Sequence, residues 1–186
     1  MGHRRFDSTL LDILMLAFTS AAASGNAGLN HRIYCMTTRD FISFTPTRLF
    51  FAPGFSVIDA TMVQAGGKYR LVFKDETLRP VRKHLRVASG DSIEGPFREL
   101  SEPFARFWVE GQTVLRIGDE CIVHYDQYTS RTYGAMRSQG LRTWENVSDQ
   151  LSLLSGTRHG TAFEVCREVL AGLIHYQPDK KPAGAR

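Results

Sequence analysis

The sequence contains few cysteines, few lysines and no long apolar run. Three cysteines in 186 residues, Cys35, Cys121 and Cys166, cannot form a disulfide framework, and no CxxC or Cys/His spacing indicates a metal site. Each cysteine has apolar neighbours, so we expect three buried free thiols. No stretch long enough to cross a membrane is free of charge, which excludes a conventional transmembrane helix. With 42% hydrophobic and 11% aromatic residues the chain can bury a core, which excludes a disordered protein.

The net charge of +4 is carried by 18 arginines and only 5 lysines, most of them scattered among acidic residues. The single basic cluster is residues 79–86, Arg-Pro-Val-Arg-Lys-His-Leu-Arg. We interpret it as a solvated connection between strands, because it lacks the interleaved aromatic residues with which single-strand binders stack bases. No nucleic-acid partner is therefore expected.

The two ends of the chain differ from its middle. Residues 1–29 begin with a basic stretch, continue with a largely apolar segment and end with small residues, a pattern typical of a secretory signal. Asp7 and Asp12 interrupt this pattern, so a short helix or a strand packed on the domain stays possible, and so do secreted, periplasmic and cytoplasmic locations. Residues 177–186 have no periodicity and are predicted to be a disordered tail. The expected domain is therefore residues 30–176.

The middle of the chain reads as short strands and turns. Segments 69–73, 121–125 and 173–176 are rich in β-branched and aromatic residues, and a glycine-containing turn precedes each of them. Helical periodicity of any length is absent after residue 26. The prediction is an all-β fold.

An internal repeat of about fifty residues organises these strands. Asp59, Glu110 and His159 each begin a similar segment, in which a small residue, a Thr or Gln and an apolar strand follow. The intervals between the three are 51 and 49 residues. A second set of polar positions, at the ends of other strands, has the same two intervals: Thr38, Ser89 and Ser138. Agreement between two independent markers argues against a chance pattern.

A unit of this length with about four short strands is typical of a β-propeller blade. The innermost strand of each blade lines the central channel, so equivalent positions converge although they are far apart in sequence. Asp59, Glu110 and His159 are then expected to point into one pocket. The alternative is that the two acids cap turns and that His159 is a core histidine. Ionisable groups in an interior are costly without a purpose, so three in register favour a functional site.

Paired carboxylates in a water-filled funnel suggest glycoside hydrolysis. One carboxyl group donates a proton to the leaving oxygen while another activates water, and a nearby negative charge raises the pKa of the donor. Trp108 lies two residues before Glu110. Its ring could stack on the apolar face of a sugar or belong to the core, and the sequence supports both interpretations.

These residues resemble glycoside hydrolase family 43. The segments that carry the resemblance are 55–61, 108–111, 118–120 and 158–161, within a similarity that runs from about residue 30 to residue 176. The resemblance implies a five-bladed propeller. It also implies the activity of β-xylosidases, α-L-arabinofuranosidases and arabinanases, which act on plant polysaccharides with inversion.

The resemblance also implies roles for individual residues. Asp59 corresponds to the aspartate that modulates the pKa of the donor, and Glu110 corresponds to the general acid. His159 corresponds to the axial histidine that, in many members, helps to hold a calcium or similar cation through water molecules. The residues expected to contact the sugar or support the site are Trp108, Arg158, Asp126 and Arg131.

One departure from the family pattern affects the expected activity. The general base of the family is an aspartate on the first blade, and only 58 residues precede Asp59 here. We therefore expect about three blades without the base, with residues 10–25 as a remnant or replacement of the preceding blade, or with another chain completing the propeller. A non-catalytic glycan-binding propeller or an inactive truncated relative is the alternative. A kelch-like interaction propeller is disfavoured, because the paired glycines of that repeat are absent.

Overall fold

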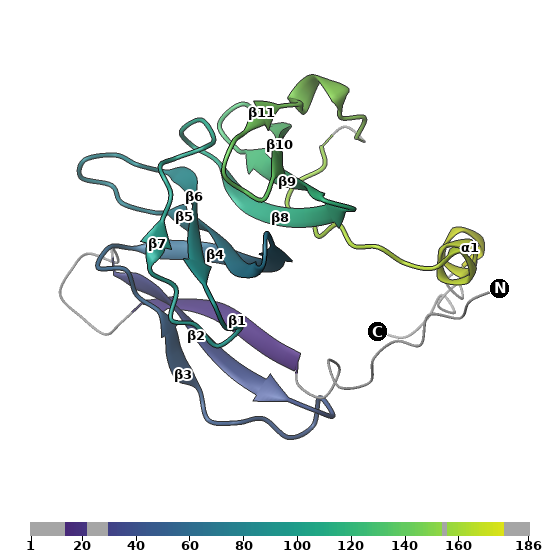
Figure 1. Cartoon of the computed structure of the whole chain (residues 1–186). Helices are drawn as coiled ribbons and strands as arrows, with labels where there is room; N and C mark the ends of the chain where they lie inside the picture. Colours follow the sequence, from purple (N-terminus) through teal and green to yellow (C-terminus); the bar gives the residue numbers. More distant parts are fainter. Residues whose placement is uncertain (1–13, 22–29, 154–155, 177–186) are drawn as a thin grey trace, which may run out of the picture.

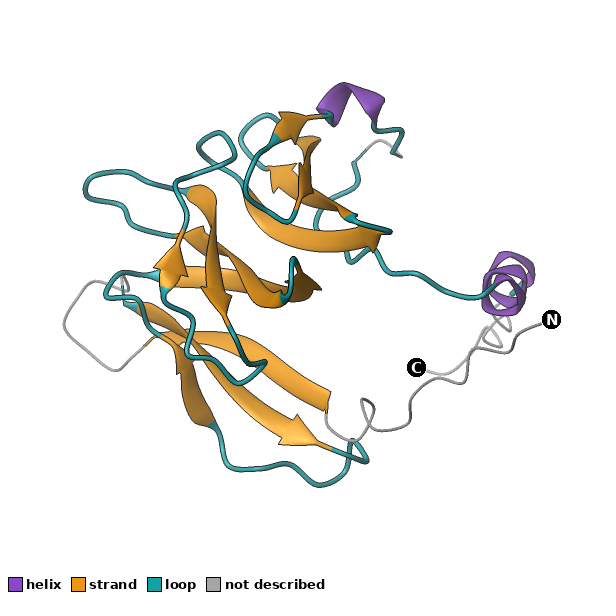
Figure 2. Cartoon of the chain, viewed as in Figure 1, coloured by secondary structure: helices purple, strands orange, loops and turns teal. Residues whose placement is uncertain are grey.

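The computed structural model describes residues 14–21, 30–153 and 156–176. Strands are the main secondary structure of these residues, and they form three antiparallel sheets that follow one another along the chain (Figures 1 and 2). The prediction of an all-β fold is confirmed. No helix among the described residues is long and apolar enough to span a membrane.

The three sheets are built from consecutive strands. The first contains β1 (Leu14–Ala21), β2 (His31–Thr38) and β3 (Arg48–Phe51). The second contains β4 (Val57–Ala65), β5 (Lys68–Asp75), β6 (His84–Gly90) and β7 (Glu99–Leu100). The third contains β8 (Glu110–Ile117), β9 (Glu120–Gln127), β10 (Thr132–Gln139) and β11 (Glu145–Asn146). A 3-10 helix (Ser148–Gln150) follows, and then α1 (Arg167–His175), the one α-helix of the residues that the structure describes.

The second and third sheets repeat one another. Each begins with a long strand that is joined by a tight glycine turn to the next strand, and the sheet order follows the chain order. Gly66, Gly67 and Gly118 in these turns have positive φ, the conformation that tight hairpin turns demand and that glycine adopts without strain. The spacing of about fifty residues predicted from the sequence corresponds to the distance from β4 to β8.

Neighbouring sheets pack face to face through β5, which is buried on both sides. Leu71 and Phe73 join a cluster with Ile33 and Phe51 of the first sheet. Val72, which points to the opposite side, joins a cluster that contains residues of the third sheet. Burial on both faces is the physical reason for the continuous apolar run in this strand.

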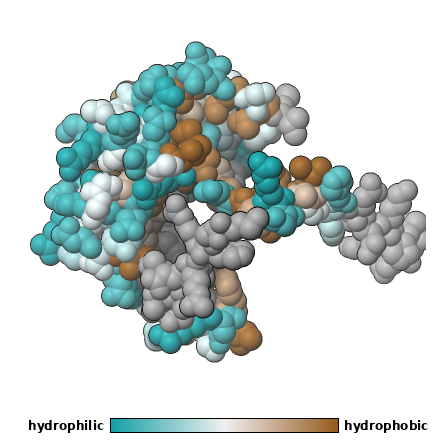
Figure 3. Space-filling model, turned by 45° about the vertical axis from the view of Figure 1, so that its right-hand side comes forward, coloured by the Kyte–Doolittle hydropathy of each residue, from teal (hydrophilic) through white to brown (hydrophobic). Residues whose placement is uncertain are grey.

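The third unit of the predicted repeat does not form strands. Residues 157–166 lie in a loop, and the expected strand 173–176 lies at the end of α1, so this prediction is wrong. Helix-favouring residues such as Glu168, Leu170 and Ala171 dominate the segment, and a four-residue apolar run alone cannot distinguish a strand from a helix. In Figure 1 α1 lies apart from the sheets, and none of its residues is buried. Figure 3 shows apolar atoms on the surface of this projecting part.

With the first sheet, the described residues contain three sheets. Its strand β1 falls inside residues 1–29, which the sequence separated from the domain, and pairs with β2 along its whole length from Leu14 opposite Thr38 to Ala21 opposite His31. A strand packed on the domain is one of the structures that the sequence leaves open for that segment. Asp7, Asp12 and the predicted tail 177–186 lie outside the described residues.

Two smaller predictions need correction. Cys35 and Cys121 are buried free thiols as expected, but Cys166 is exposed at the start of α1. The basic stretch is solvated only in part, because Lys83 and His84 are buried at the start of β6. Burial lowers the pKa of His84, although Asp75 opposes that effect.

A close approach between two strands gives a test of the packing. Gly134 on β10 lies opposite Tyr125 on β9, and a Cβ atom at position 134 would lie 2.4 Å from the Tyr125 ring. Because that ring is buried and cannot move aside, we expect Gly134→Ala to lower the free energy of unfolding by about 1–3 kcal/mol in urea denaturation. Gly172→Ala is the control, since it adds a methyl group to open space on a helix. Unchanged stability of Gly134→Ala would contradict this packing.

Candidate active site

Asp59 lies in a bulge of β4, and Glu110 lies directly before the matching bulge of β8, in which Gly111 is the equivalent of Asp59. The pairing of β4 with β5 shifts between Ile58 and Thr61, and the pairing of β8 with β9 shifts between Glu110 and Thr113. Asp59 has a φ of 52°, and Gly111 has a φ of 59°. Such bulges turn a side chain away from its ordinary direction and are frequent beside active sites. The first bulge therefore turns Asp59 out of the regular strand pattern, whereas Glu110 keeps its pairing with Asp126 at the edge of the second bulge.

The two bulges are joined by hydrogen bonds between the sheets. The backbone N–H of Gly111 donates to Oδ2 of Asp59 at 2.9 Å, and the side chain of Gln112 donates to the backbone oxygen of Asp59. The convergence of Asp59 with the Glu110 segment, predicted from the repeat, is thus observed. Asp59 fixes the peptide that directly follows Glu110.

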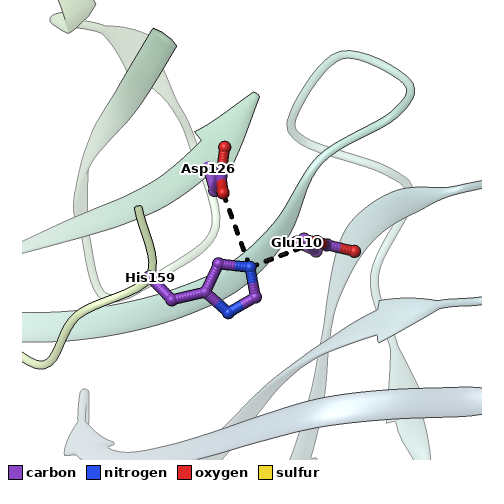
Figure 4. Close-up of side chains that lie close together, drawn as sticks. All are labelled: Glu110, Asp126 and His159. Atoms are coloured by element: carbon purple, nitrogen blue, oxygen red, sulfur yellow. Dashed lines mark hydrogen bonds and ion pairs between the residues drawn. The ribbon is translucent and has the colours of Figure 1, made fainter. Parts of the chain in front are cut away.

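Glu110 forms a cluster with Asp126 and His159 (Figure 4). The strand register places Glu110 opposite Asp126 on β9. Nε2 of His159 lies 3.1 Å from Oε1 of Glu110 and 3.5 Å from Oδ2 of Asp126. Nε of Arg158 donates to the same Asp126 oxygen at 2.6 Å. Sequence positions 110, 126, 158 and 159 therefore meet at one end of the third sheet.

The loop that carries His159 is held against the strand by a glycine. A Cβ atom at position 111 would lie 2.8 Å from the imidazole ring, so only glycine allows His159 to lie this close. His159 reaches Glu110 from a loop and not from a channel strand. Its convergence with Glu110 is confirmed, whereas the expected strand that would carry it is absent.

Lys74 is the residue of the site that the sequence interpretation missed. Its side chain is 2% exposed and its ammonium group lies 3.2 Å from Oε2 of Glu110 and 2.8 Å from Oε2 of Glu76. Glu76 also pairs with Lys83, and the ring of Tyr128 lies 5.0 Å from the Lys74 nitrogen. The available signal was a lysine that directly follows the apolar run of β5.

These neighbours set the ionisation of Glu110. Partial burial raises the pKa of Glu110, but the hydrogen bond and charge of Lys74, together with His159, outweigh burial and lower the pKa below its ordinary value. For Lys74 burial acts in the opposite direction and lowers the pKa. The Glu76 and Glu110 carboxylates more than compensate, so the pKa of Lys74 is raised above its ordinary value. The structure thus favours a carboxylate paired with an ammonium group.

Aromatic side chains lie beside this ion pair. The ring of Trp108 packs edge-on against Tyr128 at 6.3 Å between centroids, and Trp108 remains 38% exposed. Phe107 is exposed next to it and packs on His84. Arg131, by contrast, is exposed in the turn between β9 and β10 and makes no hydrogen bond or ion pair to the cluster among the described residues. The rings offer a partly exposed apolar face beside the carboxylate of Glu110.

Glu110, Asp126 and His159 together offer donor atoms for a cation. One ligand atom each from Glu110, Asp126 and His159 lie within 4.8 Å of one another, a donor set of two oxygens and one nitrogen that suits a divalent metal. Arg158 and Lys74 bind the same carboxylates and would compete with a cation. The donor atoms are therefore of the right chemical type for a cation. A bound cation would have to displace Lys74 and Arg158 from the carboxylates or bind beside them.

Comparison with known proteins places this geometry in a family. A family model described as "Probable glycosyl hydrolase domain", related to glycoside hydrolase family 43, matches residues 14–170. No match was found among curated proteins.

Solved structures with a similar fold are family-43 enzymes. A thermostable family-43 glycoside hydrolase is similar with a TM-score of 0.64 at 14% identity, over 81% of this chain and 57% of that chain. The α-L-arabinofuranosidase from Lactobacillus brevis has a TM-score of 0.56 at 16% identity, over 72% and 50%. An exo-β-1,3-galactanase from Phanerochaete chrysosporium has a TM-score of 0.53 at 9% identity, over 77% and 34%.

The chain spans little more than half the length of the first of these structures. At such identities the similarity establishes the fold, which is that of the family-43 propellers, as the resemblance of the sequence implied. The family match covers most of the chain and both bulged strands. The chain therefore belongs to the family of glycosyl hydrolase domains related to glycoside hydrolase family 43.

Proposed function

We propose that this domain acts on xylosides or arabinosides of plant polysaccharides by inverting hydrolysis, with Glu110 as the general acid. The observation that carries the proposal is the position of Asp59 in the bulge of β4 and of Glu110 directly before the bulge of β8 in the adjacent sheet, joined through Gly111. A carboxyl group with an exposed side, beside aromatic rings, is the arrangement that protonation of a glycosidic oxygen requires.

The other residues of the site support this step from their positions. Asp59 holds the peptide after Glu110 and contributes negative charge near the donor, which is the task of a modulator. Trp108 provides a face for the sugar ring. Asp126 is buried and orients Arg158, whose half-exposed guanidinium group is available to sugar hydroxyls. Arg131, in a neighbouring turn, is proposed as an outer contact. We assign no general base among the described residues.

A non-catalytic glycan-binding domain is the second candidate, and Lys74 is the observation that favours it. A general acid must hold its proton at the working pH, whereas Lys74 lowers the pKa of Glu110. A carboxylate that stays ionised can still accept hydrogen bonds from sugar hydroxyls. The pocket would then bind a glycan without cleaving it.

We further propose that His159, with Glu110 and Asp126, holds a calcium or similar cation near the axis. Such a cation would supply positive charge that organises the carboxylates around the sugar. His159 would help to hold it through water molecules bound at its Nε2 atom, which faces both acids. In the absence of a cation Arg158 and Lys74 neutralise the same carboxylates.

Substitution of Glu110 distinguishes the two candidate functions. We expect Glu110→Gln to lower kcat/KM on aryl β-xylosides or α-L-arabinofuranosides by about 10²- to 10⁴-fold, because the amide cannot donate the proton. Binding of xylo- and arabino-oligosaccharides, measured by calorimetry, should change only a few-fold. β-1,3-Galactan oligosaccharides are included because one structural relative is a galactanase.

The matched control is Glu145→Gln, which removes an exposed carboxylate that pairs with Arg137 in the third sheet. This variant should keep its full activity. Full activity of Glu110→Gln would overturn the assignment of the general acid. Binding of oligosaccharides by the unaltered chain without turnover would support the glycan-binding function instead.

Removal of Lys74 tests its control of Glu110. Lys74→Met should raise the pKa of Glu110, read directly from ¹³C chemical shifts of the carboxyl group during a pH titration. It should also lower the free energy of unfolding at neutral pH by about 2–4 kcal/mol, because two partly buried carboxylates lose their partner. If the chain is active, the alkaline limit of its pH–rate profile should move to higher pH.

The sign of the pH dependence follows from the lowered pKa. The contribution of ionised Glu110 to stability is present above the ordinary glutamate pKa and is lost as the pH falls through the lowered value. The difference in stability between the unaltered chain and Lys74→Met should therefore shrink on acidification. Lys68→Met, which breaks the exposed pair with Glu99, is the control and should change little. An unchanged titration of Glu110 in Lys74→Met would contradict this role.

Cation binding is tested by thermal unfolding. Calcium chloride should raise Tm in a saturable way, since a ligand that binds only the folded state stabilises it. His159→Ala should abolish the rise. An equal rise with potassium chloride at the same ionic strength would refute a specific site.

A further inference from the structure

A pocket lies at the end of the sheets opposite Glu110. It has a volume of about 480 Å³ and is lined by the β4–β5 turn, the β8–β9 turn and the segment after β10. Glu110 begins β8 and Arg116 lies near its end, so the two sites are separated by roughly 20 Å of extended strand. This pocket is therefore distinct from the candidate active site.

Three arginines line this pocket, and one of them is buried. Arg70 is only 4% exposed. One of its terminal nitrogens donates to the Ser89 hydroxyl, whereas its Nε has no hydrogen-bond partner among the described residues. A buried guanidinium group with an unused donor is costly, because it has lost water without gaining a full set of partners.

The other two arginines project from the surface around Arg70. Arg116 is held in place by the backbone oxygens of Gly118 and Gln64, at 2.8 Å and 3.2 Å from its donors. Arg142 is exposed, and its charge together with burial lowers the pKa of Arg70. The arginines therefore repel one another across an open pocket.

Acidic groups near the pocket only partly neutralise this charge. Asp119 lies 3.9 Å from Arg116 and is fully exposed, so the pair is weak. Glu99 acts on Arg70 from the second sheet, but its carboxylate is bound by Lys68 at 2.7 Å. Three arginines against one lining acid leave an excess of positive charge.

We propose that this pocket binds an oxyanion, either inorganic phosphate or sulfate or the carboxylate of an acidic sugar unit. Such a group would pair with the exposed Arg116 and Arg142, and the charge of Arg70, which also lines the pocket, would add to the attraction. Charge-assisted hydrogen bonds to planar guanidinium groups are the usual means of recognising these anions. The volume accommodates either a free ion with water or one sugar residue. The proposal does not depend on the proposed hydrolysis.

Titration followed by ¹H–¹⁵N NMR tests the proposal on the whole chain. Phosphate, sulfate and glucuronate are added separately at constant ionic strength, with xylose as the neutral comparison. Saturable shifts of Gly66 and Gly140, which line the pocket, are expected with at least one of the anions and not with xylose. Stronger binding of glucuronate would identify an acidic sugar as the source, and stronger binding of phosphate or sulfate would identify a free ion.

Variants of the exposed arginines complete the test without disturbing the core. Arg116→Gln and Arg142→Gln should each weaken binding by about tenfold, since each removes a charge-assisted contact. Arg79→Gln, an exposed arginine outside the pocket, should bind as the unaltered chain does. Shifts that do not saturate, or that are the same in all variants, would overturn the proposal.

Discussion

The carboxylate of Glu110 lies between nitrogen-bearing side chains that come from two directions. Lys74 approaches from β5 of the second sheet, and His159 and Arg158 approach from the loop after the third sheet. Each contact joins segments far apart in the sequence, so the ion network fixes the second sheet, the third sheet and the loop relative to one another. Lys74 is almost fully buried, and its charge is stabilised there by the side chains of Glu76 and Glu110, 2.8 Å and 3.2 Å from its nitrogen. The geometry of the site and its charge state are therefore set by the same interaction.

The shape of the site depends on the repeated bulge. A regular strand would alternate its side chains between two faces, and a carboxylate at the start of β4 or β8 would then pack against a neighbouring sheet. The bulges at Asp59 and directly after Glu110 break this alternation where the channel strands begin. The hydrogen bond from Gly111 to Asp59 then locks one bulge against the other. Because glycine at this position also admits the His159 ring, one residue serves both the sheet contact and the loop contact.

The sequence predicted the features that depend on local pattern and period. The β class, the repeat of β4 and β8 and the contact of Asp59 with the Glu110 segment follow from alternation and spacing, which are properties of the chain alone. His159 also reaches Glu110, but from a loop and not from the predicted third strand. It failed at residues 157–176, where a short apolar run was interpreted as a strand although the segment forms a loop and α1. It also missed Lys74, because the significance of a lysine in an apolar strand depends on which carboxylates a neighbouring sheet brings to it. Pairing between sheets is not encoded in any single segment.

The two ends of the sheets carry opposite chemistry, and this has a physical origin in the blade geometry. Asp59, Glu110 and Asp126 lie where β4 and β8 begin and β9 ends, whereas Arg70 and Arg116 lie toward the opposite turns. Strands of equal length in register keep these groups apart by the length of a blade, so the two charges do not neutralise each other. At the Glu110 end the carboxylates are paired with Lys74 and Arg158, whereas at the opposite end three arginines face one lining acid. The blade geometry therefore leaves the unbalanced positive charge at the turns, away from Glu110.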